Sequence, residues 1–198
     1  DEEHADTISL LEAVKFEMAF MFAYSLRERT HAHHRMQDDV EPEVKQRRLE
    51  EIIETFKRHA LAANLAQRGR RHLVLVEGPS RRSTAERPQW QGRADNGCRV
   101  VFDDAPIAAS MPSVLVRACD AGVPWHLRQS LPASDGARAP SIEEATLLGQ
   151  RPPVRAQPGD YVLVQVNNAS HTTLYGTPLG RTTLQEHALA LQAPASGL

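Results

Sequence analysis

The sequence predicts an α+β fold in two parts: a helix–strand–helix unit of the α/β type, followed by a small antiparallel β-barrel. Three observations predict this division. An apolar run at residues 16–24 follows directly on a helical pattern. Beyond Gly69 the spacing of apolar residues changes from a helical to a strand-like period. Residues 104–153 lose all pattern and are rich in Pro, Ala and Ser, so we expect a long flexible insertion there.

The composition is that of a soluble globular protein. Of the 198 residues, 41% are hydrophobic and 24% are charged. No window approaches about 18 consecutive apolar residues, so we expect no membrane span. The acidic start DEEHAD does not resemble a signal or transit peptide. Because there is no initiating Met and the first residues read as a helical turn, we expect the chain to be part of a longer protein.

The chain has two cysteines, Cys98 and Cys119. Neither has a partner at metal-ligand spacing, so the chain alone is expected to build no zinc knuckle and no iron–sulfur cluster. A Cys98–Cys119 disulfide is conceivable, but the lack of secretory signals favours two reduced thiols.

The first part, residues 1–66, is predicted to begin with a short helix and one buried strand. Asp6 or Thr7 is suited to cap a helix that runs to about Lys15. Residues 16–24 are apolar and aromatic apart from Glu17, as in a strand that is covered on both faces. A helix that leads into a buried strand is half of an α/β unit.

A long amphipathic helix is predicted to follow. Pro42 suits its first turn, since the missing N–H would be unpaired there, and Gly69 is placed to end it after about Ala66. Its apolar residues recur at steps of three and four. They are Leu49, Ile52, Ile53, Phe56, Ala60 and Ala63.

The second part, residues 67–186, is predicted to hold short strands separated by Gly and Pro turns. The runs with strand-like pattern are residues 72–77, 99–102, 160–166, 172–175 and 179–184. Several short strands in a part of this size are typical of a small closed or nearly closed antiparallel barrel. Residues 187–198 are expected to form a flexible tail.

Arginines are concentrated at the start of the second part. Residues 67–99 carry eight arginines against three acids, Glu77, Glu86 and Asp95. Such a basic patch is typical of a surface that binds a phosphate backbone. The alternative is a solvated arginine-rich surface with no ligand.

Polar residues follow the predicted strand at the end where ligands gather in α/β barrels. We expect a group of five to face a cofactor or substrate, namely Tyr24, Ser25, Arg27, Arg29 and Thr30. Guanidinium groups suit carboxylates and phosphates alike. The alternative is that Tyr24 and Ser25 only finish the strand, while Arg27 pairs with an acid such as Asp38.

Three histidines follow this group, His31, His33 and His34. Alternating histidines suggest a metal site, but no further ligand lies at helical or hairpin spacing. We therefore expect polar residues at the rim of the site, and we assign no metal.

Two blocks together resemble the radical-SAM domain of MiaB-type tRNA methylthiotransferases, FMFAYSLRERT at residues 20–30 and QDDVEPEVKQRRLEEII at residues 37–53. Glu41 departs from the family pattern because it separates Val40 from Pro42. The matching positions are Tyr24, Ser25, Arg27, Thr30, Asp38, Asp39, Val44, Lys45 and Arg48.

The second part resembles the TRAM domain of the same family, a small β-barrel that holds tRNA. The resemblance lies in LVLVEGPSRRS at residues 73–83, GRADN at 92–96, QPGDYVLVQV at 157–166 and GRTT at 180–183. It covers residues 1–103 and 154–186 and leaves 104–153 outside. The residues it implies for RNA binding are Arg81, Arg82, Arg93, Asn96, Arg181 and Thr182. The alternative for each arginine is an exposed turn residue.

The resemblance implies an enzyme that adds a methylthio group to N6-isopentenyladenosine next to the tRNA anticodon, in mitochondria, with the cytoplasm as the alternative location. The family uses two 4Fe–4S clusters and S-adenosylmethionine, and this chain lacks the cysteines that bind the clusters. We therefore assign no catalytic residue and expect the chain alone to bind tRNA without catalysis and without a cofactor. The alternatives are a truncated protein-interaction module and, as the least favoured, a self-sufficient enzyme.

Overall fold

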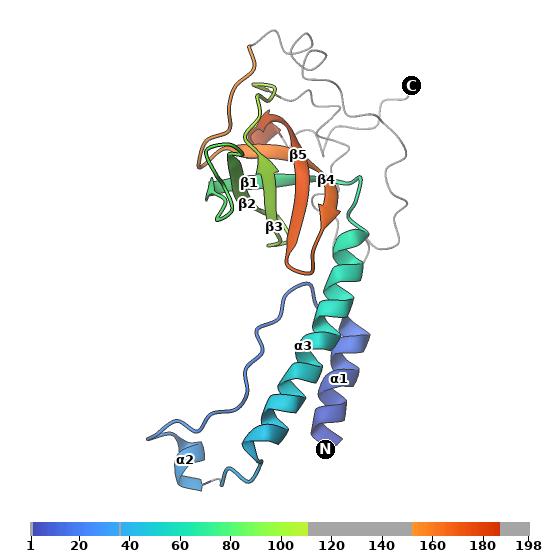
Figure 1. The fold of residues 1–198 in the computed structure, drawn as a ribbon, viewed down its shortest axis with the longest axis vertical. Coiled ribbons are helices and arrows are strands. Elements are labelled where there is room, and N and C mark those ends of the chain that lie inside the picture. The colour runs from blue at the N-terminus through green and yellow to red at the C-terminus, as the bar shows by residue number, and fades with distance from the viewer. Residues whose placement is uncertain (1, 36, 111–151, 187–198) are drawn as a thin grey trace. The chain divides into compact units, whose positions relative to one another are not determined.

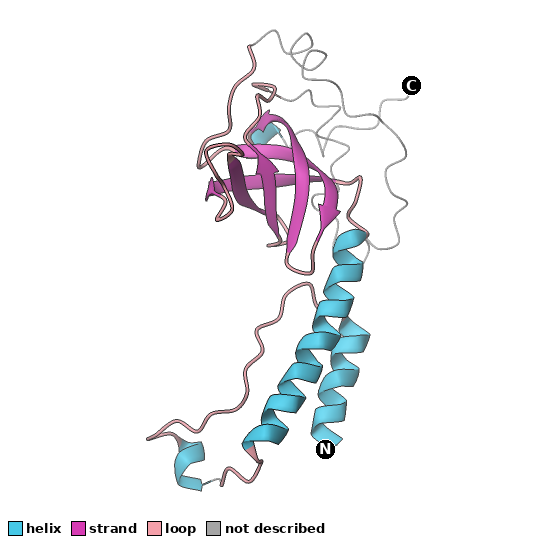
Figure 2. Ribbon diagram, viewed as in Figure 1, coloured by secondary structure: helices cyan, strands magenta, loops and turns pink. Residues whose placement is uncertain are grey.

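The computed structural model describes residues 2–35, 37–110 and 152–186 (Figure 1). The chain divides into two compact units, residues 1–62 and 63–198. Figure 2 shows that helices dominate the first unit and strands the second. Within the described ranges, every helix is too short or too polar to cross a membrane. The predicted tail at residues 187–198 lies outside the described residues.

The first unit contains α1 (Glu2–Val14), α2 (His31–Arg35) and most of α3 (Pro42–Leu65). Two side-chain pairs join α1 to α3: His4 Nε2 lies 2.9 Å from Glu51 Oε2, and Arg58 lies 3.2 Å from Glu12 Oε1. Because the partners advance together along both helices, α1 and α3 run parallel. Parallel neighbouring helices require a connection that returns along them, as in an α/β unit.

The long helix is confirmed. It begins at Pro42 and ends at Leu65, close to the predicted Ala66. Phe56 and Ala60, from its predicted apolar face, are buried. Gly69 follows with φ +81°, the left-handed conformation that only glycine adopts without strain.

The strand predicted at residues 16–24 is wrong for this structure. These residues form no strand and pair with none of the described strands. Phe20 and Phe22 are 80% and 83% exposed, although their type predicts burial. An apolar run indicates that a segment favours burial between neighbouring strands, but it does not supply those strands.

The two short elements beside this segment also differ from the prediction. Helix α1 already begins at Glu2, so Thr7 is inside the helix and its hydroxyl donates to the Glu3 carbonyl at 2.8 Å. Helix α2 was not predicted. Thr30 caps it, since the His33 N–H donates to Thr30 Oγ1 at 3.2 Å.

The second unit is a five-stranded sheet that closes in a ring, with the strands in the order β1-β2-β3-β5-β4. Its strands are β1 (Arg71–Pro79), β2 (Gln89–Ala94), β3 (Arg99–Asp103), β4 (Tyr161–Ala169) and β5 (Thr173–Thr182). The prediction of an antiparallel sheet is wrong for one pair, because β3 and β5 run parallel. The other four pairs are antiparallel.

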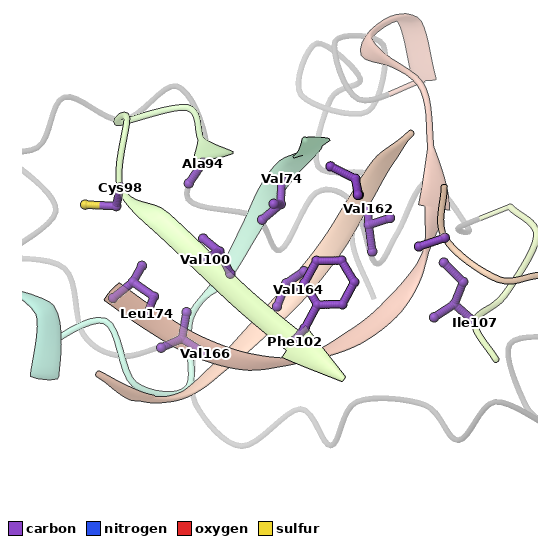
Figure 3. Packing of buried hydrophobic residues seen from close by; sticks show 12 residues of the cluster. Val74, Ala94, Cys98, Val100, Phe102, Ile107, Val162, Val164, Val166 and Leu174 are labelled. Atoms are coloured by element: carbon purple, nitrogen blue, oxygen red, sulfur yellow. The ribbon is translucent and has the colours of Figure 1, made fainter. Parts of the chain in front are cut away.

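Side chains that point into the ring form the core of the second unit (Figure 3). Valines alternate with outward residues along β1 and β4, as the strand period requires. Phe102 on β3 is 2% exposed and contributes the largest of these side chains. The cluster comprises Val74, Val76, Ala94, Cys98, Val100, Phe102, Ile107, Ala156, Val162, Val164, Val166 and Leu174.

Two strands in the second unit differ from the prediction. Strand β2 was missed, because the sequence QWQGRA has no regular apolar alternation. The runs at residues 172–175 and 179–184 form one strand, β5, which continues through Pro178 with a register shift opposite Leu163 and Val164. A bulge tolerates a proline that a regular ladder would exclude.

The prediction of a flexible insertion at residues 104–153 is wrong for its first residues. Ile107 is fully buried and bridges Val154, while Ala108 bridges Gly180 of β5. Ile107 and Ala108 are therefore joined to the second unit by backbone bridges. Residues 111–151, which carry the rest of the predicted insertion and Cys119, lie outside the described residues.

Candidate nucleic-acid interface

Four of the five residues predicted to face a cofactor or substrate line one hollow in the first unit. The hollow has a volume of about 670 Å³. Its lining is Met21, Phe22, Ala23, Tyr24, Ser25, Arg27, Thr30, Ala32 and Leu49. Arg29, the fifth predicted residue, is not part of this lining and has φ 63°. The backbone turns sharply there, and the Thr30 hydroxyl donates to the Arg27 carbonyl at 2.8 Å across the turn.

Lys45 lies beside Tyr24, one of the residues that line this hollow. Its ammonium group forms an ion pair with Asp38 and lies 5.8 Å from the centre of the Tyr24 ring, within cation–π range. The suggested pairing of Arg27 with Asp38 is therefore wrong, because Lys45 takes that role. Among the described residues, the Arg27 guanidinium has no ion-pair partner and remains available to an anion.

Arg81 and Arg82 lie in the loop between β1 and β2. The loop is held by its own serines: the Gln89 N–H donates to Ser83 Oγ at 2.9 Å, and the Arg82 N–H to Ser80 Oγ at 3.4 Å. Both arginines are exposed, and none of the ion pairs between described residues involves them. The loop thus carries two guanidinium groups that are free to meet phosphates.

Arg93 and Asn96 lie at the other end of β2. Arg93 contacts Glu77 on β1, with Nε 3.4 Å from the carboxylate, and it also donates to the Gly97 carbonyl at 2.9 Å. Asn96 Oδ1 accepts from the Cys98 N–H at 3.1 Å and so supports the β2–β3 turn. The side-chain amide nitrogen of Asn96 is not used by that contact.

Arg181 and Thr182 lie at the end of β5, beside a hollow of about 540 Å³. Arg181 is 3.7 Å from Asp160. Thr182 is only 4% exposed, and its hydroxyl donates to Glu186 at 3.3 Å. The described contacts of Thr182 are therefore those of a structural residue. The six residues implied for RNA binding are spread over one loop, one turn and two strands rather than gathered at one point.

Asp103, at the end of β3, compensates one further arginine. Gln89 Nε2 donates to its carboxylate at 2.7 Å, and Arg87 Nε at 3.2 Å. These hydrogen bonds, that from Gln89 first, hold the pKa of Asp103 below its ordinary value. Arg87 is thus neutralised at physiological pH, unlike Arg81 and Arg82 in the same loop.

Four side chains on neighbouring strands lie side by side on the outside of the ring, and we call them the outer row: Tyr161, Leu75, Arg93 and Arg99. Leu75 pairs with Tyr161 on one side and with Arg93 on the other, and Arg93 pairs with Arg99. Arg93 and Arg99 belong to the basic stretch predicted from the sequence, whereas Tyr161 and Leu75 were not singled out. The alternation of buried and exposed positions could have indicated their outward direction, but not which residues are neighbours.

The described residues contain no group of three His, Cys, Asp or Glu that could hold a metal ion. His33 and His34 meet edge to face, with ring centres 5.2 Å apart. The Cys98 side chain is buried in the core of the second unit. An iron–sulfur cluster requires several cysteine thiolates at one point, and the described residues contain a single cysteine, so the described part of this chain does not fit one.

No protein-family model matches the chain. Curated proteins do match it. The mitochondrial tRNA methylthiotransferase CDK5RAP1 of Homo sapiens is 40% identical over 186 residues, which is 94% of this chain and 24% of the relative. A CDK5RAP1-like protein of Oryza sativa is 34% identical over 186 residues, again 94% of this chain and 24% of the relative. The tRNA-2-methylthio-N(6)-dimethylallyladenosine synthase of Amoebophilus asiaticus is 42% identical over 123 residues, which is 62% of this chain and 25% of the relative.

The chain thus spans about a quarter of the length of the curated relatives it matches. The alignments with the human and rice proteins cover 94% of the chain, so they cannot leave out the whole of residues 104–153. The expectation that this segment lies outside the resemblance is therefore wrong for these relatives.

Proposed function

Since this chain is a homologue of part of the tRNA methylthiotransferases, we propose that its second unit is the tRNA-binding part of such an enzyme. The unit is then a TRAM-type domain, and the first unit is the terminal α/β unit of a radical-SAM barrel. The longer enzyme adds a methylthio group to N6-isopentenyladenosine next to the anticodon. The human relative is a mitochondrial enzyme, which supports a mitochondrial location.

The observation that carries this proposal is the loop between β1 and β2. Arg81 and Arg82 are exposed there without a carboxylate partner among the described residues, while Arg87 in the same loop is paired with Asp103. Arginines that are not compensated within the protein attract phosphate and release its counterions. Such contacts position an RNA without reading its sequence.

The hollow beside Tyr24 and Arg27 has a different proposed role. Its open, partly polar lining suits one wall of a site for a cofactor carboxylate or a substrate phosphate, with Arg27 as the group that binds the anion. The cluster chemistry requires cysteines that this chain does not have. We therefore propose that this chain binds RNA and positions it, while other parts of the enzyme carry out the catalysis.

The tRNA-binding proposal predicts a strong and specific salt dependence. The full chain should bind a tRNA transcript in a gel-shift assay at low salt. Changing Arg81→Gln and Arg82→Gln together should lower the magnitude of the slope of log K against log salt by about 2, since each phosphate contact contributes about 1. The measurement is the dissociation constant at four or more salt concentrations.

Arg155→Gln is the matched control for this experiment, because Arg155 is exposed but is paired with Asp104 at 2.9 Å. It should leave the slope unchanged. If the unsubstituted chain shows no affinity for tRNA at low salt, the proposed function is refuted. An unchanged slope in the double variant would show that the loop with Arg81 and Arg82 does not contact the RNA.

A second candidate function is supported by the exposed segment at residues 16–26. Every second side chain there is apolar and exposed. They are Phe16, Met18, Phe20, Phe22, Tyr24 and Leu26. A monomeric protein rarely exposes such a row, which is typical of a surface that binds protein. In this alternative the chain is an interaction module without an RNA role.

This candidate predicts that the full chain associates through the exposed segment. Light scattering after size exclusion should show assemblies larger than one chain. The double change Phe20→Glu and Phe22→Glu should restore a monomer, because both rings face solvent and their loss costs no packing. A monomeric unsubstituted chain, or assemblies that persist in the variant, would contradict it.

A further inference from the structure

The outer row crosses four neighbouring strands of the closed sheet. Tyr161 on β4, Leu75 on β1, Arg93 on β2 and Arg99 on β3 are consecutive partners across the ladders. Directly paired residues share a face of the sheet, and adjacent strands lie about 4.8 Å apart. The row therefore presents an aromatic ring, an aliphatic side chain and two guanidinium groups along about 15 Å.

The burial of the flanking residues shows that the row faces outward. Val74 and Val76 on either side of Leu75 are buried in the core, and Leu75 itself is 37% exposed. In the same way, Arg93 is exposed between the buried Gly92 and Ala94. The side chains of the row therefore lie on the outside of the ring.

The tyrosine end of the row borders a hollow. Tyr161 lines the cavity of about 540 Å³ that Arg181 and Thr183 also line. A planar group that lies on the Tyr161 ring would thus have open space beside it, with a further guanidinium group in reach of that space. Apart from Tyr161, the residues that line the hollow lie outside the row, at and beyond the ends of β4 and β5.

From this arrangement we propose that the outer row binds single-stranded RNA, with one base stacked on Tyr161 beside Leu75 and the adjoining phosphates on Arg93 and Arg99. Aromatic rings that accept bases, beside arginines that follow the backbone, are the common means of binding unpaired nucleic acid. The inference rests on the proposed tRNA-binding function and adds to it the surface used and the unpaired state of the RNA.

The contact between Arg93 and Glu77 is part of this arrangement. The carboxylate lies 3.4 Å from Arg93 Nε, while the Gly97 carbonyl accepts from another guanidinium nitrogen. A guanidinium group has five N–H donors, so these two contacts orient Arg93 and leave donors for a phosphate. Arg99 has no ion pair with a described residue and contributes its full charge.

The test compares two tyrosines of the same sheet in the full chain. Tyr161 pairs with Thr182 at one end of the β4–β5 ladder, and Tyr175 pairs with Asn168 near the other end. The probes are a fluorescein-labelled oligouridine of about 12 nucleotides, a blunt RNA duplex of the same length and a tRNA transcript. Fluorescence anisotropy gives the dissociation constants.

We expect the oligouridine to bind more tightly than the duplex. Tyr161→Ala should weaken its binding by at least about fivefold, because it removes a stacking partner. Tyr161→Phe keeps the ring and should stay within about twofold of the unsubstituted chain. Tyr175→Ala should have no effect. Independently of stacking, Arg99→Gln should lower the magnitude of the salt slope by about 1.

The outcomes separate the two proposals. If tRNA binds but Tyr161→Ala loses no more affinity than Tyr175→Ala, the outer row is refuted and the tRNA-binding function remains. Equal affinity for the duplex and the oligouridine would also refute the proposal that the outer row binds unpaired RNA. If no RNA binds to the unsubstituted chain, the proposed function itself fails. If circular dichroism shows that Tyr161→Ala does not fold, the Arg99→Gln variant tests the proposal instead. An unchanged salt slope in that variant would then refute RNA binding by the outer row.

Discussion

Gly92→Ala is expected to destabilise the second unit by about 3 kcal/mol, the upper end of the range for overpacking a well-packed core. A Cβ atom at this position would lie 2.2 Å from the Leu75 carbonyl oxygen and 2.7 Å from Val74 Cγ1. The first of these atoms belongs to the backbone of β1, which is paired with β2 at this point. The ladder would have to shift as a whole to relieve the contact, because no flexible side chain can move aside.

The control for this substitution is Gly78→Ala in β1. A Cβ atom there would meet no heavy atom within 4 Å. We expect its effect on the free energy of unfolding to stay within about 0.5 kcal/mol. Equal effects at Gly92 and Gly78 would contradict the close approach of β1 and β2 at this point.

Phe102→Ala is expected to cost about 3–5 kcal/mol, the usual range for removing a buried Phe ring. The ring is 2% exposed, and it lies among the valines of β1 and β4 that point into the closed sheet (Figure 3). A small closed sheet has few ways to collapse around a cavity. Most of the lost packing should therefore appear as a decrease in the free energy of unfolding. The matched control is Phe22→Ala, because Phe22 is 83% exposed.

Urea unfolding measures how Gly92→Ala and Phe102→Ala each change the free energy of unfolding. Trp90 packs against the core, so its fluorescence reports the second unit. The chain has two tryptophans, and a Trp125→Phe background makes Trp90 the single probe. A shift in the unfolding midpoint at constant slope shows a change in stability rather than in the unfolded state. Phe22→Ala should leave the midpoint unchanged, and a comparable shift in Phe22→Ala and Phe102→Ala would contradict the core described here.

Local signals predicted the elements that carry a strong period or a strong terminator. Helix α3 has both, with Pro42 at its first turn and Gly69 after its end. Strands β1 and β4 alternate valine with other residues, so the core positions Val74 and Val162 follow from the strand period. Strand β2 has a weak pattern and was missed, because its place depends on the two strands that flank it.

The candidate site, too, could be predicted from the sequence only in part. The arginine excess at residues 67–99 is visible in the sequence, and it pointed to a phosphate-binding surface before any strand was placed. Which of these arginines are compensated could not be predicted. The Arg87–Asp103 pair joins residues 16 positions apart, and only the pairing of β2 with β3 brings them together.

By itself, the sequence determined the family resemblance, the long helix and most of the strands, because these depend on residues close together along the chain. Only the tertiary structure decided that β3 and β5 run parallel, that the ring closes, and that Tyr161, Leu75, Arg93 and Arg99 form one row. Strand register sets such neighbours, and register arises from long-range pairing that no local pattern encodes. The apolar run at residues 16–24 shows the reverse case, since its preference for burial is local while the strands that would bury it are not among the described residues.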